Sequence, residues 1–333
     1  MDRLQELSST QGTDTASHVT QGLIDMIDIL TLILESPFLQ RAIIGAILIA
    51  IVAATSGSFL VFRGLSFMTS GVAHAALGGA ALGLFLQDTG IAPWFDPVLG
   101  ALAFAVFVAI VTGYAGESGI AEKMEVAVGV SFALSMSLAV FLMYYIPPQD
   151  TLVIWGYLVG DILLLTTSNV VTLGLVTLIL VAVTFFFGKE FIYVSVDMEG
   201  SIAHGMNARA YHYLMLITAA LAITMATKAV GAILVYAILV APAAASNEVL
   251  KSVRGVVIAV FLIALTTELV GIAASFVIRV SPSAVAGLLA ALSYVVALTI
   301  KRRRMDIGDE LLPDEQEAEL ERLIEEGQEP HQH

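Results

Sequence analysis

Nine long apolar runs constrain this chain more than any other feature of its sequence. Each is close to the roughly 20 residues that a helix needs to cross about 30 Å of hydrocarbon. Lipid offers the backbone no hydrogen-bonding partner, so helices, which pair their own amides, are the expected structure. The runs are approximately 39–62, 67–86, 97–115, 126–146, 169–187, 213–227, 230–245, 255–278 and 283–300. The sequence therefore predicts an all-α polytopic membrane protein with about nine transmembrane helices.

Composition supports a membrane protein and removes several chemical classes. Of the 333 residues, 58% are hydrophobic and 13% are charged, well below the roughly 25% charged residues of soluble domains. The formal net charge of −14 comes from the two tails, because the residues between 36 and 305 hold twelve acids and thirteen bases. No nucleic-acid partner is expected. Zero cysteines exclude disulfides, thiolate metal sites and a cysteine nucleophile.

The segment 151–168 is apolar but is closely bounded by Pro147, Pro148 and Asp150 on one side and by a polar TTSN sequence on the other. We predict a short re-entrant or interfacial helix there. If it crossed the membrane fully, everything before it would have the opposite orientation.

Loop charges predict the orientation, because Lys and Arg in short loops tend to remain cytoplasmic. When the basic stretch 301–304 is placed inside, the bases of most other loops fall on the same side, and the N-terminus falls outside. The exceptions are Arg41, Lys228 and Arg279, which lie at span ends where a long side chain can reach the interface.

Three regions follow from this pattern. Residues 1–36 form a polar segment with an interfacial helix near 23–34, residues 37–300 form the membrane domain, and residues 301–333 form a basic stop and an acidic tail. The tail is either solvated or, around 314–326, an amphipathic helix. His331 and His333 near its end are weak candidates for metal contact.

His74 is the first candidate functional residue, since ionisable groups inside spans are costly and are functional by default. It lies about 10 Å below the start of the second run at 1.5 Å per residue. Ser70, four residues earlier, shares its helical face. Imidazole nitrogen suits zinc and other first-row divalent metals, so this face is a candidate metal site. The alternative is a buried histidine bonded to a neighbouring carbonyl.

Glu268 is the second candidate, near the middle of the eighth run. A lone carboxylate there stays protonated unless it meets a cation, so Glu268 is predicted to complete a metal ligand set with His74. The alternative is a neutral glutamic acid bonded to Thr267 or to another helix.

Small residues predict where helices touch. Gly71, Gly79 and Gly83, with Ala75 between them, recur every four residues beside the His74 face, and Gly160 repeats this spacing after Gly156. Such columns let a second backbone approach closely, so the His74 helix is expected in the crowded centre of the bundle.

The hydrophilic connection 188–212 contains residues 197–205, which predict a short helix closed by glycine. Such an element between two spans is suited to contact with a partner protein, although an ordinary amphipathic connection would look the same.

Six ordered blocks between about residues 38 and 300 belong to one pattern. They are GSFLVFRGLSFM at 57–68, SGVAHAALGGAALG at 70–83, KMEVAVG at 123–129, YLVGDIL at 157–163, VDME at 196–199 with Ala203, Gly205 and Met206, and VGAILVYAILVAPAAA at 230–245. Together they resemble the membrane subunit of metal-ion ABC importers, the permease family that carries zinc, manganese or iron. Where that family has an aspartate four residues before its histidine, this chain has Ser70, so of the implied pair only His74 is retained.

The resemblance implies a type II ABC importer-like permease in the plasma membrane of a prokaryote, with a divalent metal ion as its transported substrate and no permanently bound cofactor. It implies a cytoplasmic ATP-binding subunit, an extracytoplasmic solute-binding protein and a second permease copy. The ATP-binding subunit would dock on Asp197, Glu199, Ala203 and Gly205. ATP hydrolysis belongs to that partner, because the chain has no Gly-x-x-x-x-Gly-Lys-Ser/Thr loop.

Three other functions compete with a metal importer. A cobalamin- or siderophore-type permease shares the architecture, and a gradient-driven secondary transporter would show two repeated halves with broken helices. An intramembrane hydrolase using Ser70 and His74 is disfavoured, because residues four apart on one helix seldom present nucleophile and base together.

Overall fold

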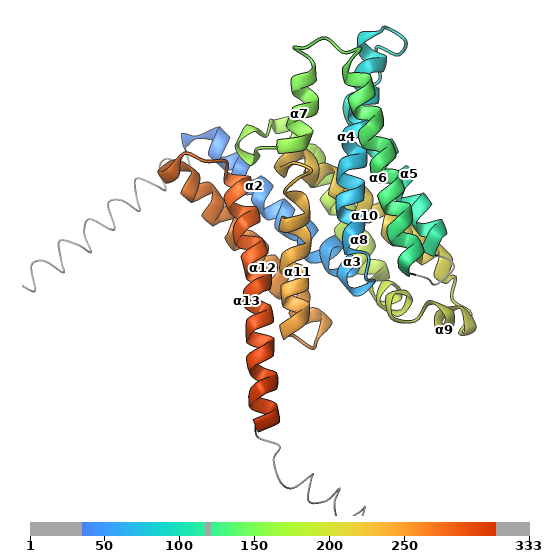
Figure 1. Cartoon of the computed structure of the whole chain (residues 1–333), viewed down its shortest axis with the longest axis vertical. Coiled ribbons are helices and arrows are strands. Elements are labelled where there is room, and N and C mark those ends of the chain that lie inside the picture. The colour runs from blue at the N-terminus through green and yellow to red at the C-terminus, as the bar shows by residue number, and fades with distance from the viewer. Residues whose placement is uncertain (1–34, 117–120, 311–333) are drawn as a thin grey trace, which may run out of the picture.

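The computed structural model describes residues 35–116 and 121–310, and this part of the chain is built from helices and their connections (Figure 1). Two of the elements are not α-helices: η1 is a π-helix and η2 is a 3-10 helix. In chain order the elements are α2 (Pro37–Val52), η1 (Ala53–Gly57), α3 (Ser58–Phe62), α4 (Ser66–Asp88), α5 (Pro97–Gly116), α6 (Ala121–Met143), α7 (Thr151–Val159), η2 (Ile162–Leu164), α8 (Thr167–Val196), α9 (Met198–Ala203), α10 (Ala208–Val230), α11 (Val235–Val249), α12 (Val253–Ile278) and α13 (Pro282–Glu310).

Within the described residues, eight helical stretches are long and apolar enough to span a membrane. The first joins α2, η1 and α3 into one continuous stretch, and the others are α4, α5, α6, α8, α10, α12 and α13. They correspond to eight of the nine predicted runs. The remaining run, 230–245, does not form one continuous helix. Helix α10 ends at Val230, Gly231 follows it with a φ of 91°, and α11, which begins at Val235, has only 15 residues.

Local chemistry explains where many helices begin. The side chains of Ser36, Thr166, Asn207 and Ser252 each accept a hydrogen bond from a backbone N–H in the first turn of the following helix. These caps satisfy donors that have no partner within the helix. Helices α2, α5 and α13 begin at proline, whose fixed φ suits the first helical position.

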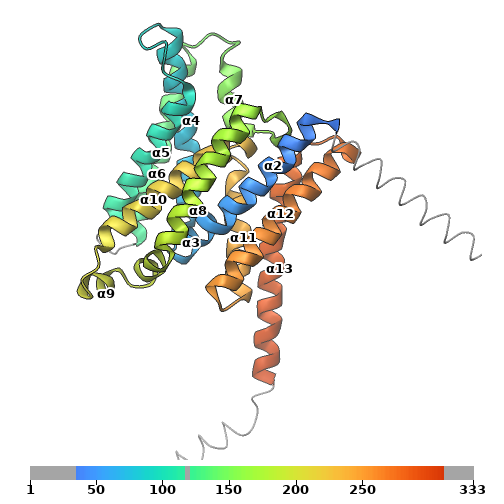
Figure 2. The same ribbon diagram turned by 180° about the vertical axis from the view of Figure 1, so that it is seen from behind.

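Helix α4 lies in the centre of the bundle. It packs against α5 and α6 on one side and contacts α10 and α11 on the other, whereas α12 packs mainly against α13, α11 and α2. Figure 2 shows the opposite face, on which α8 runs obliquely beside α10. Most of the membrane-spanning surface of α8 is exposed, which is typical of a helix that faces lipid.

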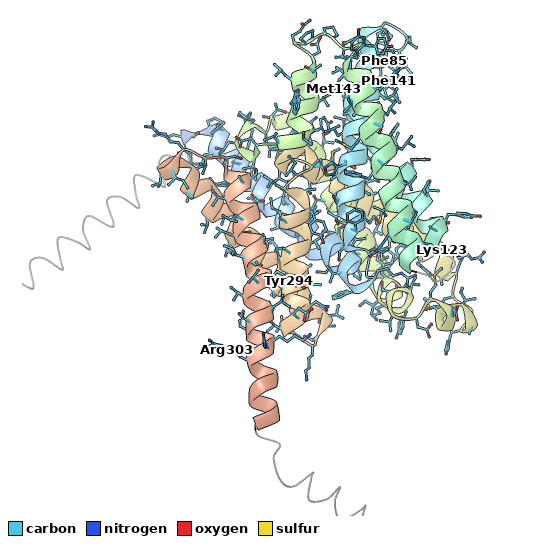
Figure 3. The ribbon with its side chains drawn as sticks, in the orientation of Figure 1. Phe85, Lys123, Phe141, Met143, Tyr294 and Arg303 are labelled. Atoms are coloured by element: carbon cyan, nitrogen blue, oxygen red, sulfur yellow. The ribbon has the colours of Figure 1, made fainter. Side chains whose placement is uncertain are left out.

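The two ends of the bundle differ in charge. Figure 3 places Lys123 and Arg303 away from α7 and places Phe85 and Phe141 at the α7 end. The aromatic rings of Phe85, Phe141 and Tyr145 contact one another there. This separation agrees with the loop charges used above, so the α9 end is the predicted cytoplasmic end.

The segment 151–168 forms α7 and η2 rather than one long helix. Gly160 ends α7 with a φ of 58° and packs directly on Gly231, and the N–H of Ala232 donates to the carbonyl of Tyr157 at 2.9 Å. Gly160 is therefore a close-contact residue, as predicted, but between two loops rather than two helices. A Cβ at Gly156 would meet no atom within 4 Å, so Gly156 makes no such contact.

The interfacial helix predicted near 23–34, the amphipathic helix predicted near 314–326, and His331 and His333 lie outside the described residues.

Candidate functional site

Helix α4 has one open stripe, and His74 lies on it. Every residue from Met68 to Leu84 is buried except Ser70, His74 and Leu82. Ser70 and His74 lie about 40° apart around the helix and Leu82 about 80° further on, while Gly71 and Gly78, which pack against α6, fall within the same arc; we call the three partly exposed residues the open stripe. A polar hydroxyl and an imidazole therefore occupy the part of α4 that the rest of the chain leaves partly uncovered.

A backbone hydrogen bond determines which nitrogen of His74 is available. Its Nδ1 lies 2.9 Å from the carbonyl oxygen of Ser70, one turn earlier. A carbonyl oxygen only accepts, so Nδ1 carries the hydrogen, and in the neutral ring Nε2 keeps its lone pair. Metal-binding histidines are commonly oriented by this kind of second hydrogen bond. The sequence-based alternative, a histidine bonded to a neighbouring carbonyl, is thus correct, and this hydrogen bond leaves Nε2 of the neutral ring without a hydrogen.

Helix α6 holds the imidazole from the side. The ring of Phe132 contacts His74 edge to face, with 4.7 Å between the ring centroids. Gly71 and Gly78 let α6 approach, because a Cβ at Gly71 would overlap the side chain of Val128 and one at Gly78 would lie 2.5 Å from the carbonyl oxygen of Ser135. The residues beside the imidazole are thus fixed by close helix packing.

The predicted glycine column serves two partners. Gly71 faces α6, whereas a Cβ at Gly79 would overlap the carbonyl oxygen of Gly100 and one at Gly83 would lie 2.8 Å from the Cα of Pro97, both on or next to α5. Four residues turn a helix by about 400°, so a column at this spacing drifts by about 40° per step. The drift carries the column from α6 to α5 and explains why α4 is enclosed by both.

Glu268 lies apart from His74. It is completely buried on α12, and neither carboxylate oxygen has a hydrogen-bond partner within the described residues. The hydroxyl of Thr267 donates to the carbonyl of Ala264 instead, and α11 lies between α12 and α4, contacting both. The structure therefore does not bring the Glu268 carboxylate and the His74 imidazole into one ligand set within a single chain.

No three His, Cys, Asp or Glu side chains in residues 35–116 and 121–310 lie close enough together to hold a metal ion. A single copy of the chain thus offers the His74 imidazole and, at most, weak oxygen ligands such as the Ser70 hydroxyl. A complete coordination shell requires ligands from elsewhere.

Helix α9 confirms the short helix predicted for 197–205. Asp197 begins it by accepting from the N–H of Gly200 at 2.8 Å, and Gly205 follows it with a φ of 80°. Glu199 and Ala203 are exposed, and a depression of about 440 Å³ lies beside the helix against Tyr193 and Met206. The α9 surface thus combines exposed charge with an accessible hollow.

Arg63 is a functional candidate that the sequence did not single out. It lies between α3 and α4, and its Nη1 donates to the carbonyl of Val194 at 2.9 Å while its Nη2 donates to the sulfur of Met198 at 3.4 Å. Burial lowers the pKa of the guanidinium, yet arginine remains charged in proteins. Arg63 therefore ties the start of the His74 helix to the start of α9. The only sequence feature that could have drawn attention to Arg63 is its position as a lone arginine directly before a glycine at the end of a span.

Several known proteins are similar to this chain in sequence or in structure. ScaB of Streptococcus gordonii, a manganese import system permease protein, is 30% identical over 79% of this chain and 91% of its own length. MntC of Listeria monocytogenes, a manganese transport system membrane protein, is 24% identical over 80% of this chain and 91% of its own length. The solved structure of PsaBC from Streptococcus pneumoniae in complex with Fab is similar with a TM-score of 0.72 and 26% identity, covering 85% of this chain and 99% of that one.

The family pattern extends across nearly the whole membrane domain. Residues 35–301 match the ABC 3 transport family. The resemblance to metal-ion ABC importer permeases, first indicated by the six sequence blocks, is confirmed by this match. The chain belongs to the ABC 3 transport family.

Proposed function

We propose that this protein is the membrane subunit of an ATP-driven importer that moves divalent metal ions, manganese foremost, along the open stripe of α4. The observation that carries the proposal is His74, an imidazole that is partly exposed on a largely buried helix and whose Nδ1, bonded to the Ser70 carbonyl, leaves Nε2 available as a ligand. Relatives that transport manganese support the choice of ion.

A second copy of the chain is proposed to complete the path. One imidazole is too few ligands for a divalent transition-metal ion, and the open stripe of α4 lacks protein cover. A homodimer that places two such stripes face to face would bring two His74 rings to one axis, as the closed symmetry of most homo-oligomers allows. The remaining ligands would be water and weak oxygen groups such as Ser70.

Energy is proposed to enter through α9. A cytoplasmic ATP-binding subunit would dock on its exposed residues, Asp197, Glu199, Ala203 and Gly205, and Arg63 would transmit its movement to α4. An extracytoplasmic solute-binding protein would deliver the ion at the α7 end. A bound ion can shift the equilibrium between the two conformations only by the difference in its affinity for them. ATP hydrolysis must therefore drive the change between the conformations.

Two alternatives carry less support. A gradient-driven carrier does not fit membership of the ABC 3 transport family. A permease for cobalamin or a siderophore needs a wide path, whereas α4 is held against α5 and α6 at glycines that leave no room for a Cβ.

Reconstitution with the ATP-binding partner tests the function directly. In proteoliposomes supplied with ATP we expect Mn²⁺ to be taken up and to stimulate ATP hydrolysis, since the ion is the substrate that couples the cycle. Zn²⁺ and Fe²⁺ are compared at equal free concentration, with cobalamin as the chelate control. Uptake driven by a proton or sodium gradient without ATP would contradict the proposal.

Arg63→Gln is expected to uncouple the transporter. The substitution removes the charge-assisted contacts to Val194 and Met198, so we expect uptake to fall about tenfold while ATP hydrolysis continues. Both rates are measured in the same vesicles. The control is Lys301→Gln, which breaks an exposed ion pair with Glu248 (2.6 Å) that should contribute little. A parallel fall of uptake and hydrolysis would show that Arg63 has no separate coupling role.

A further inference from the structure

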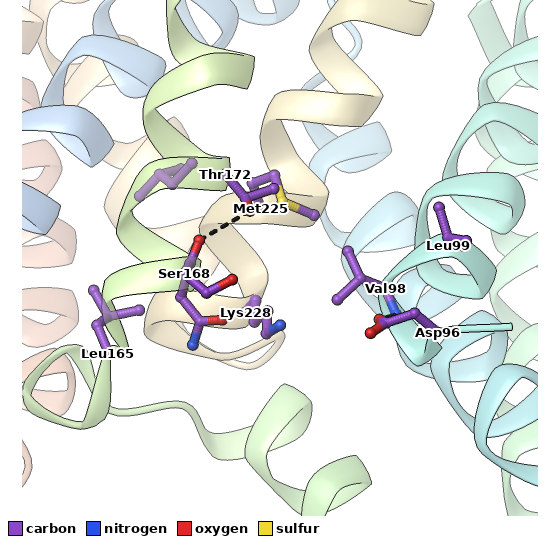
Figure 4. A pocket seen from close by; sticks show the side chains of 10 residues that line it. Asp96, Val98, Leu99, Leu165, Ser168, Thr172, Met225 and Lys228 are labelled. Carbon is purple, nitrogen blue, oxygen red and sulfur yellow. Dashed lines mark hydrogen bonds between the residues drawn. The ribbon is translucent and has the colours of Figure 1, made fainter. Parts of the chain in front are cut away.

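A polar pocket of about 340 Å³ lies at the α7 end, between the first turns of α5 and α8 and the last turns of α10 (Figure 4). In Figure 4, Asp96 stands on one side and Ser168 on the other, with Lys228 between them, and Asn169 also lines the pocket. A second pocket of about 420 Å³ adjoins it and shares Asn169 and Lys228. Because both are lined by Leu165, Asn169 and Lys228, we call the two together the Lys228 pocket. It is separate from the stripe that carries His74, because none of its lining residues belongs to α4.

Lys228 forms no ion pair within the described residues, although Asp96 lines the same pocket. The side chain is partly buried in the last turn of α10, and no carboxylate of the described residues lies within ion-pair distance. Its Nζ lies 6.0 Å from the centroid of the Tyr157 ring. Removing an ammonium group from water without a partner is costly, so an anionic ligand at this position would be strongly favoured.

Two further groups in the pocket support an occupant with hydrogen-bonding oxygens. Tyr157 is 2% exposed, and its hydroxyl has no hydrogen-bond partner in the described part of the chain. Asn169 and Ser168 lie in the first turn of α8, where the helix dipole favours negative charge. A phosphate group provides acceptors for the ammonium, the hydroxyl and the amide together.

Part of the pocket lining is apolar, and the helices that form it also expose apolar side chains. Leu173 and Met225 line the pocket, α8 exposes Val171 (55%) and Leu175 (58%), and α5 exposes Leu99 (47%). A free inorganic anion would use none of this surface. A molecule with a charged head and acyl chains would use both parts.

We propose that the Lys228 pocket binds one phospholipid, with the lipid phosphate on Lys228 and, in phosphatidylethanolamine, the ammonium group facing Asp96. Asp96 is suited to this contact because one of its oxygens already accepts from the N–H of Val98 at 2.7 Å and is thereby fixed at the pocket mouth. The lipid would join α5, α8 and α10 at the membrane surface. The inference does not depend on the metal path.

The test is native mass spectrometry of the purified full-length chain, incubated in detergent with phosphatidylethanolamine, phosphatidylglycerol or a diacylglycerol of the same acyl chains. We expect one phospholipid to be retained per chain and the diacylglycerol, which lacks phosphate, to be lost. Lys228→Gln should lower retention about tenfold, as expected for loss of one charge-assisted contact. Lys228→Arg should keep it. Lys189→Gln, which neutralises an exposed cation at the other end of α8, is the matched control and should change nothing.

Specificity is tested by Asp96→Asn, which preserves a capping side chain for α5 but removes its charge. This variant should bind both phospholipids and lose the preference for phosphatidylethanolamine over phosphatidylglycerol. If Lys228→Gln does not fold, Asn169→Leu in the same pocket replaces it, with the same expected loss. The inference is overturned if these variants retain lipid like the wild type, or if diacylglycerol is retained equally. It is also overturned if inorganic phosphate binds with the same Lys228 dependence and phospholipid fails to displace it.

Discussion

His74→Ala is expected to abolish metal uptake while the chain still folds and its complex still assembles. The substitution removes the imidazole that we propose as the metal ligand on the open stripe of α4, and we expect uptake to fall about a hundredfold or more, because even outer-shell partners of a metal site contribute 10- to 100-fold in affinity. The helix itself should be unaffected, since Ala is the best helix former. Initial rates of Mn²⁺ uptake in proteoliposomes measure the effect, and size-exclusion chromatography measures assembly.

Glu268→Gln provides the contrast. The neutral amide suits the dry surroundings of α12, and Glu268 is separated from α4 by α11, so uptake should stay within about twofold of the wild type. If Glu268→Gln lost uptake as completely as His74→Ala, the carboxylate would belong to the metal path after all, as the sequence alone suggested. Normal uptake by His74→Ala would remove the imidazole from the path.

Gly79→Val is expected to prevent correct packing of α4. A Cβ at this position would overlap the carbonyl oxygen of Gly100, and a backbone atom of α5 cannot rotate away as a side chain can. Overpacking of a well-ordered core costs roughly 1–3 kcal/mol even when side chains can adjust, so we expect a loss near or above the upper limit. Thermal unfolding of the purified protein in detergent, together with the fraction recovered as a monodisperse species, measures it.

Gly129→Val on α6 is the matched control. A Cβ there meets no atom within 4 Å, so the substitution tests the effect of replacing a membrane-helix glycine without the close approach. Its unfolding temperature should stay close to that of the wild type. Equal destabilisation by both variants would show that the contact between α4 and α5 is not what makes Gly79 necessary.

The sequence predicted the helices well because lipid imposes a simple rule. A segment in hydrocarbon must be long, apolar and helical, so hydropathy locates α4, α5 and α12 to within a few residues. Hydropathy says less where a helix leaves the membrane. Helix α8 continues to Val196, well past the predicted end at 187, because its last turns stay helical until Asp197 starts α9.

The site was predicted only in part, because residue contacts between helices are not encoded in local pattern. His74 and Ser70 could be placed on one face from their spacing, yet the hydrogen bond from Nδ1 to the Ser70 carbonyl, and hence the free Nε2, required coordinates. Glu268 and His74 were predicted to share a metal ligand set because both are ionisable residues inside predicted spans. Depth in the membrane, however, does not determine which helices contact each other. Lys228 could be placed at a span end from the sequence, but its approach to the Tyr157 ring, 6.0 Å from Nζ to the centroid, could not.

The most direct test of the account is pulsed electron paramagnetic resonance of Mn²⁺ bound to the permease and its ATP-binding partner, prepared with ¹⁵N-labelled histidine. The account predicts a nitrogen hyperfine coupling typical of imidazole bound to manganese in the wild-type complex and its loss in His74→Ala. A coupling that persists unchanged in His74→Ala, or a wild-type complex that binds Mn²⁺ with no imidazole coupling, would contradict the assignment of α4 as the metal path.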